Sequence, residues 1–131
     1  MVQLHGGEDS SYIDDLRAAR SDISIIQAVQ VGTADDLALL SQCTNAPDLY
    51  LLDNIRGGSG ESFDWSLLNA YTAKVPFLLA GGIGLQNIDE VIRLSSHKQQ
   101  LLGIDINSKV ELSPGIKDIK KVQAISERIR A

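Results

Sequence analysis

Asp53 is the residue in this sequence that is best placed to do chemistry. It ends the apolar run LYLL at residues 49–52, and NIRGGSGE follows it, a glycine-rich loop longer than a simple connector needs. A carboxyl group at a strand end beneath such a loop can act as a general acid once the loop excludes water. An aspartate that only caps the turn after its strand gives the same local pattern. Both interpretations stay open on this pattern alone.

Two further strand ends predict a phosphate site. In the stretch LLAGGIGLQNI, Gly81 and Gly82 follow an apolar run shortly before a predicted helix, so backbone N–H groups there could approach a phosphate closely. The next strand ends in the polar residues Asp105, Asn107 and Ser108. In a (β/α)8 barrel, the phosphate site lies at the ends of the last two strands. Each signal is weak alone, and their order along the chain strengthens the prediction.

The other reactive side chains have weaker cases. His5 ends the first strand, where a hydrogen-bonded histidine and a catalytic one are equally consistent with the pattern. Cys43 follows the second predicted helix and should face the opposite end of the sheet, away from the chemistry. His97 is interpreted as a solvated surface residue and Trp65 as a buried ring.

Composition excludes several classes of protein. With 131 residues, 44% of them hydrophobic and 22% charged, the chain can bury a core as one domain over residues 1–131. The net charge of −5 argues against binding nucleic acid or a membrane surface through bulk charge, and favours a small-molecule partner. A single cysteine allows neither an internal disulfide nor a zinc site built on several thiols. We expect a cytoplasmic protein without a metal.

Short apolar runs alternate with amphipathic segments along the whole chain. Ser11 with Asp14 resembles a capping box for the first helix, and Thr33 can cap the second, with Leu37, Leu39 and Leu40 facing inward. The expected strands cover residues 2–5, 23–31, 48–53, 75–82 and 101–106. Helices are expected from about Ser11, after Thr33, after Phe63 (short), after Gln86 with Ile88, Val91 and Ile92 as its stripe, and from about Ile116 with Ile119, Val122, Ile125 and Ile129 buried.

Apolar strands separated by helices predict an α/β fold with a parallel sheet. Five βα units are too few for a complete TIM (β/α)8 barrel, which needs eight. Five is also the number of strands in a flavodoxin-like doubly wound sheet. The strand count leaves both an incomplete barrel and a rearranged flavodoxin-like sheet open.

The strand ends, in this order, resemble the phosphoribosylanthranilate isomerase family, small barrels of tryptophan biosynthesis. The resemblance lies in VQLHG (2–6), LLDNIRGGSGESFDW (51–65), FLLAGGIGLQNI (77–88) and GIDINSKVELSPGIKD (103–118). It covers essentially the whole chain. It implies that the chain corresponds to strands 4–8 of the barrel and that three βα units have no counterpart in these residues.

The resemblance implies an Amadori rearrangement of N-(5'-phosphoribosyl)anthranilate that needs no cofactor. Asp53 matches the family's general acid, and Asp105 a carboxylate near the sugar. The family's general base is a cysteine in its first strand, which has no counterpart here. The residues expected to bind substrate or phosphate are Gly58, Gly60, Gly81, Gly82, Asp105, Asn107 and Ser108, with His5 as a further candidate.

The sequence departs from the family pattern at Asn107 and Lys109, where the family usually has Ser and Gly, and at Leu85, where Pro is common. Lys109 could add a cation near the phosphate or obstruct the close approach that glycine permits.

These residues alone are expected to be inactive, with unpaired strand edges that favour self-association or a complementing N-terminal fragment. The alternatives are a non-catalytic phosphate-binding or assembly remnant of the barrel and, less favoured, the related histidine-pathway isomerase.

Overall fold

The chain alternates strands and helices along almost its whole length in a computed structural model that describes residues 1–55 and 61–131. The strands are β1 (Val2–Leu4), β2 (Ile25–Val31), β3 (Leu49–Asn54), β4 (Phe77–Leu79), β5 (Leu101–Ile104), β6 (Glu111–Ser113) and β7 (Ile116–Lys117). The α-helices are α1 (Ser10–Ala19), α2 (Ala34–Leu40), α3 (Ile88–His97) and α4 (Ile119–Arg130). Two 3-10 helices are η1 (Trp65–Ala70) and η2 (Ser108–Val110).

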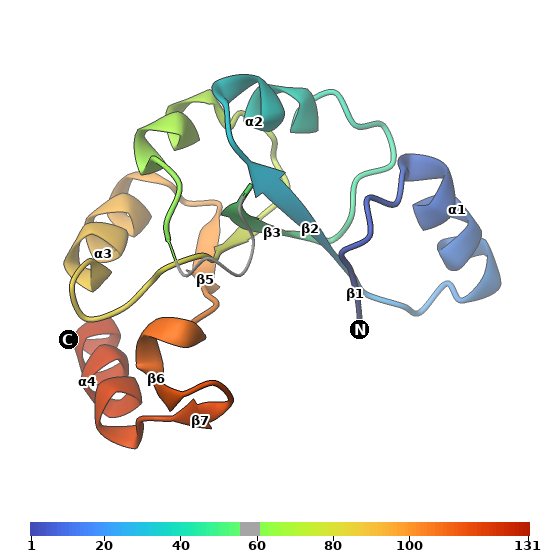
Figure 1. Cartoon of the computed structure of the whole chain (residues 1–131). Coiled ribbons are helices and arrows are strands. Elements are labelled where there is room, and N and C mark those ends of the chain that lie inside the picture. Colours follow the sequence, from blue (N-terminus) through green and yellow to red (C-terminus); the bar gives the residue numbers. More distant parts are fainter. Residues whose placement is uncertain (56–60) are drawn as a thin grey trace.

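The first five strands form a parallel sheet in the sequential order β1-β2-β3-β4-β5. This is the order of consecutive units in a barrel, whereas a flavodoxin-like sheet has the order 2-1-3-4-5. The sheet is open in the described residues, with β1 and β5 at its edges. Figure 1 shows an arch whose helices lie on the convex side. The fold is therefore an open part of a TIM-barrel-type sheet, and the rearranged strand order is wrong.

Alternate residues of β3 face opposite sides of the sheet. Tyr50 and Leu52 are fully buried in the main core, which also contains Phe77 and Leu79 of β4. Leu51 lies on the other side, where it lines an open groove. The convex face is therefore covered by helices, while the concave face is accessible from outside.

The β1–α1 unit has a separate, smaller core. Leu4, Ile13 and Ile25 are buried together, with partly buried Val2 and Leu16 against them. Three buried side chains cover far less apolar surface than the main core, so the hydrophobic stabilisation of this unit is smaller. β1 joins the rest of the sheet through its ladder with β2.

Helix caps confirm one expectation and correct another. The Thr33 hydroxyl accepts from the Asp36 N–H at 3.4 Å, and the Asp36 carboxylate accepts from the Thr33 N–H at 2.8 Å, so the predicted Thr33 cap is a capping box. Asp9, and not Ser11 with Asp14, caps α1, because its carboxylate accepts from the Tyr12 N–H.

The C-terminal segment differs from the sequence prediction. Residues 111–117 form the β6–β7 hairpin, and the last helix begins at Ile119 with Asp118 as its cap. Ile125 is buried as predicted, but Ile119 and Ile129 are 63% and 51% exposed. Leu39 of α2 is also exposed, at 58%, so its predicted inward direction is wrong.

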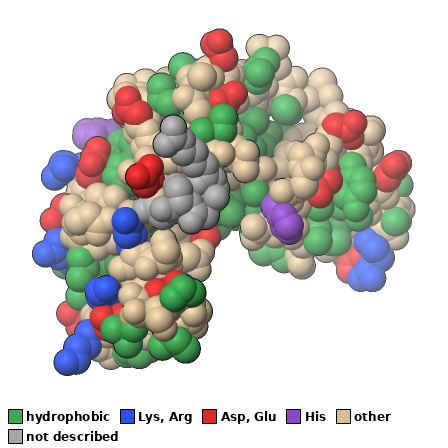
Figure 2. Space-filling model, viewed as in Figure 1, with side chains coloured by type: hydrophobic (Ala, Val, Ile, Leu, Met, Phe, Trp, Pro, Cys, Tyr) green, Lys and Arg blue, Asp and Glu red, His purple; other side chains and the backbone are tan. Residues whose placement is uncertain are grey.

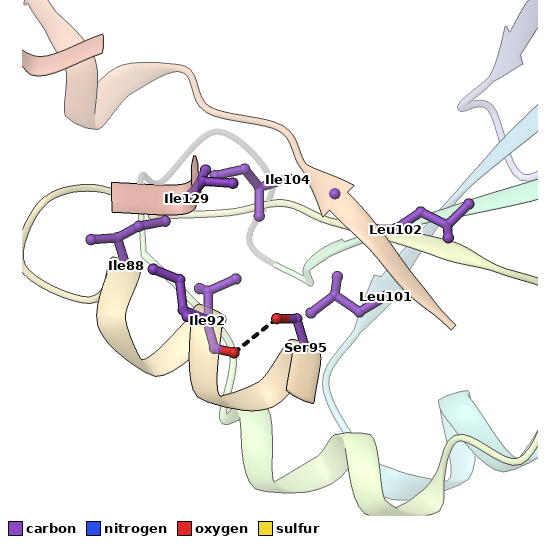
Figure 3. Close-up of a pocket in the computed structure, with 9 residues that line it drawn as sticks. Ile88, Ile92, Ser95, Leu101, Leu102, Ile104 and Ile129 are labelled. Atoms are coloured by element: carbon purple, nitrogen blue, oxygen red, sulfur yellow. Dashed lines mark hydrogen bonds between the residues drawn. The ribbon is translucent and has the colours of Figure 1, made fainter. Parts of the chain in front are cut away.

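An apolar groove of about 270 Å³ lies between α3, β5 and α4. Figure 3 shows Ile88 and Ile92 of α3, Ile104 of β5 and Ile129 of α4 around it. Leu102, on the edge strand, is 65% exposed. Within the described ranges, no helix is both long enough and apolar enough to cross a bilayer.

Candidate active site

Three predicted site residues line one open groove on the concave side of the sheet. His5 follows β1, Asp53 lies in β3, and Asp105 follows β5, so all three stand at the C-terminal ends of their strands. The groove has a volume of about 840 Å³, and its wall also includes Gln30, the register partner of Asp53 on β2. Figure 2 shows this side of the arch as an open notch. Residues far apart in sequence thus share one cavity because parallel strands end at the same edge.

The Asp53 carboxylate is held in position by its neighbours. Asp53 as a residue is half-buried, and its Oδ1 accepts a hydrogen bond from the Asn54 N–H at 2.7 Å. Gly81 lies directly against it, since a Cβ at residue 81 would stand 2.6 Å from that oxygen. Gly81 also has a φ of 82°, in the left-handed region that favours glycine. Only glycine therefore fits both the backbone conformation and the space beside the carboxylate.

Asn54 is a buried polar residue whose role no sequence pattern predicted. Its side-chain amide donates to the Glu61 carbonyl at 3.1 Å, which joins the end of β3 to the segment that leads into η1. The same carbonyl would lie 3.2 Å from a Cβ at Gly81. Asn54, Glu61 and Gly81 therefore lie together beside Asp53. The only sequence signal was an asparagine that follows an acid at a strand end.

The loop after β4 is folded onto the start of α3. The Gly82 carbonyl accepts from the Gln86 side chain at 3.0 Å and from the Asn87 side chain at 3.1 Å. The Asn87 side-chain oxygen in turn accepts from the Gly84 N–H at 2.9 Å. These bonds fix the predicted Gly81–Gly82 turn in one conformation. Asn87 was not predicted, although an asparagine just before a helix is a common capping signal.

A chain of polar contacts connects the groove with the β6–β7 hairpin. The Asn107 amide donates to the Asp105 carboxylate at 3.1 Å, and the Lys117 ammonium donates to the Asn107 carbonyl oxygen at 3.1 Å. Lys117 also donates to Glu111 at 2.8 Å, and this bond lowers the pKa of the Glu111 carboxyl. Lys117 was missed because no local pattern in the sequence shows that a hairpin returns it to Asn107.

Not every predicted site residue reaches the groove. Four of them are absent from the residues that line it: Gly81, Gly82, Asn107 and Ser108. Of these, Gly81 lies against Asp53, and Asn107 donates a hydrogen bond to Asp105. The predicted residues Gly58 and Gly60 lie outside the described residues.

Cys43, His97 and Trp65 are absent from the residues that line the groove, whereas His5 lines it. Cys43 is exposed after α2, on the segment that leads into the start of β3. His97 is the exposed last residue of α3, and Trp65 is buried as predicted. In the part of the chain that the structure describes, no three His, Cys, Asp or Glu residues are grouped to hold a metal ion.

Comparison with known proteins identifies the family. The model of the family described as N-(5'phosphoribosyl)anthranilate (PRA) isomerase matches residues 1–128. The chain belongs to this family. Of the family's relatives, an N-(5'-phosphoribosyl)anthranilate isomerase from Microcystis aeruginosa is 39% identical over 134 residues, and the match covers 98% of this chain and 61% of the relative. A tryptophan biosynthesis protein TrpCF from Yersinia pestis is 42% identical, with 25% of its length covered.

Solved structures of the family have the same fold. The crystal structure of phosphoribosyl anthranilate isomerase from Thermus thermophilus matches with a TM-score of 0.77 and 27% identity, over 98% of this chain and 59% of that one. The isomerase from Thermotoga maritima matches with a TM-score of 0.74 and 28% identity. The chain thus spans about three fifths of the single-function isomerases that it matches.

Proposed function

We propose that this chain carries the general-acid side of a PRA isomerase active site. The observation that supports this most directly is the position of Asp53, which faces the groove from the end of β3 and is fixed by Asn54 and Gly81. In the proposed reaction, Asp53 donates a proton to the furanose ring oxygen of N-(5'-phosphoribosyl)anthranilate as the bond from that oxygen to C1' breaks. The electron pair of the substrate nitrogen forms the C1'–N double bond, so no cofactor is required.

The second half of the reaction needs a base. Removal of the C2' proton neutralises the iminium nitrogen through a new C1'–C2' double bond. The C2' hydroxyl then loses its proton as C2'=O forms, the C1'–C2' double bond becomes single, and C1' takes up a proton to give the aminoketose. The family resemblance assigns this base to a cysteine in a strand without a counterpart here. Cys43 is exposed at the opposite end of the sheet and cannot reach the groove.

The substrate's phosphate is proposed to bind where the β4–α3 and β5–η2 loops meet. Gly81 and Gly82 would offer backbone N–H groups, with Asn107 and Ser108 on the neighbouring loop. His5 and Asp105 would contact the ribose or anthranilate part from the groove walls.

We further propose that residues 1–131 alone do not turn over substrate, because a missing general base costs roughly 10²–10⁴-fold. The exposed edges of β1 and β5 would pair with a complementing N-terminal fragment or with another copy. A related isomerase, that of Thermotoga maritima, is dimeric. The position of Cys43 also favours a second candidate, a phosphate-binding module without catalysis.

The experiment uses a fusion protein in which the first three βα units of the Microcystis aeruginosa relative precede residues 1–131. We call this protein the fused barrel. Fluorescence assays should show isomerase turnover by the fused barrel and none by residues 1–131 alone. A fused barrel that folds and binds phosphate without turnover would favour the non-catalytic module. Comparable turnover by residues 1–131 alone would show that the base lies within these residues.

A further inference from the structure

Lys109 stands at the junction of the two loops that are proposed to bind phosphate. It belongs to η2, directly after Ser108, and touches the β4–α3 loop at Gly84. A Cβ at residue 84 would lie 2.8 Å from the Lys109 Cβ, which is too close. The absence of a side chain at Gly84 therefore makes room for the side chain of Lys109. The lysine is therefore anchored beside the loop that contains Gly81 and Gly82.

The backbone of Lys109 accommodates a side chain without strain. In the described residues, only glycines have a positive φ, so Lys109 does not adopt a conformation reserved for glycine. The replacement of the family's usual glycine by lysine is thus accommodated at residue 109 itself and by Gly84 opposite.

The charge of Lys109 is not neutralised by another part of the described chain. Its side chain is exposed, and no hydrogen bond or ion pair joins it to a described residue. The ammonium group of Lys117, a second lysine close to these loops, already donates hydrogen bonds to Glu111 and Asn107. Of these two lysines, Lys109 is therefore the one whose ammonium group is available to bind an anion.

The surroundings give a cation at this position a clear electrostatic effect. The nearby groove carries the carboxylates of Asp53 and Asp105, and the chain has a net charge of −5. A phosphate dianion that approaches these carboxylates is repelled, and a positive charge at the loop junction offsets that repulsion.

We propose that Lys109 binds the phosphate group of the substrate through its ammonium group, in addition to the backbone N–H groups of the loops. This inference rests on the proposed function, because it takes the phosphate to bind at the β4–α3 and β5–η2 loops. It makes Lys109 a binding residue at a position where the family usually has glycine.

The test measures binding of inorganic phosphate to residues 1–131 by NMR, from the amide shifts of Gly81, Gly82 and Ser108. Lys109→Met should weaken binding about tenfold, as expected for loss of one hydrogen bond between charged groups. Lys74→Met is the matched control, because it removes the same charge from the exposed segment before β4, at the other end of the sheet, and should leave the dissociation constant within about twofold. Binding by the unmodified chain should also depend more steeply on salt than binding by Lys109→Met.

Lys109→Gly, which restores the family's usual residue, separates the two possible effects of the lysine. It should weaken binding as Lys109→Met does, and tighter binding would overturn the inference by showing that the lysine obstructs the site. Unchanged affinity in Lys109→Met, with shifts still at Gly81 and Gly82, would overturn only the role of Lys109. Absence of shifts at all three amides in every variant would overturn the phosphate site and this inference together.

Discussion

The two hydrophobic cores of the molecule support opposite walls of the groove. The main core buries Tyr50, Leu52 and Phe77 completely and holds β3, the strand that carries Asp53. The smaller core of Leu4, Ile13 and Ile25 holds β1, which leads to His5. The proposed acid is thus on the best-supported strand and His5 on the least-supported one. Local opening free energies follow such differences in buried apolar contact, so the two walls should differ in stability.

Truncation of a side chain in the main core should cause the largest loss of stability in this comparison of the two cores. Phe77→Ala removes a fully buried ring, and we expect a loss of about 3–5 kcal/mol in the free energy of unfolding. Urea denaturation measures this loss. Leu102→Ala is the control, because Leu102 is 65% exposed and should change stability by less than about 0.5 kcal/mol. Equal effects of the two substitutions would contradict the assignment of the main core.

Truncation in the small core should separate the two regions. Ile13→Ala should cost about 2–3 kcal/mol, and the loss should be local. Hydrogen exchange should show faster exchange at the amides of β1 and α1, while those of β3 and β4 keep their protection. Uniform loss of protection across the sheet would show that the β1–α1 unit does not open separately.

The α2 cap should have a smaller effect. Thr33→Ala removes the hydroxyl that accepts from the Asp36 N–H and should cost about 1 kcal/mol. Thermal unfolding tests this value, with Thr72→Ala as an exposed control outside the helices. A Thr33→Ala variant as stable as the control would mean that the box does not stabilise α2.

The smallest expected effect is a pH dependence of the same cap. Hydrogen bonds from the Gly32 and Thr33 N–H groups lower the pKa of Asp36 below its ordinary value of 3.8. Because the folded pKa is the lower one, this stabilisation is complete above 3.8 and is lost as the pH falls through the folded pKa. Urea denaturation at pH values between about 6 and 3 should show that the free energy of unfolding of Asp36→Asn falls less steeply with falling pH than that of the unmodified chain. An unchanged acid slope would contradict this coupling.

The sequence predicted the five-stranded sheet because its strands are almost continuous apolar runs. The prediction of secondary structure failed at residues 111–117, where two strands of three and two residues are too short to show an alternating pattern. Ile119 and Ile129 had helical spacing for burial, but in the described part of the chain nothing covers them fully, since α4 lies beside the open edge of the sheet.

The lining of the candidate groove was predictable where a residue ends a strand, as with Asp53, His5 and Asp105, because parallel strands end at one edge. The supporting residues Asn54, Asn87 and Lys117 were not, since their roles depend on hydrogen bonds to loops whose paths only the folded structure shows.

The central claim, that Asp53 is the general acid, is tested most directly by the turnover of the fused barrel with Asp53→Asn. The amide keeps the size of the side chain but cannot donate the ring-opening proton, so kcat should fall by at least about 10²-fold. The affinity for a product analogue should stay close to that of the unmodified fused barrel. Asp22→Asn, an exposed carboxylate outside the groove, should leave kcat unchanged. An Asp53→Asn variant that keeps most of its kcat would contradict the account.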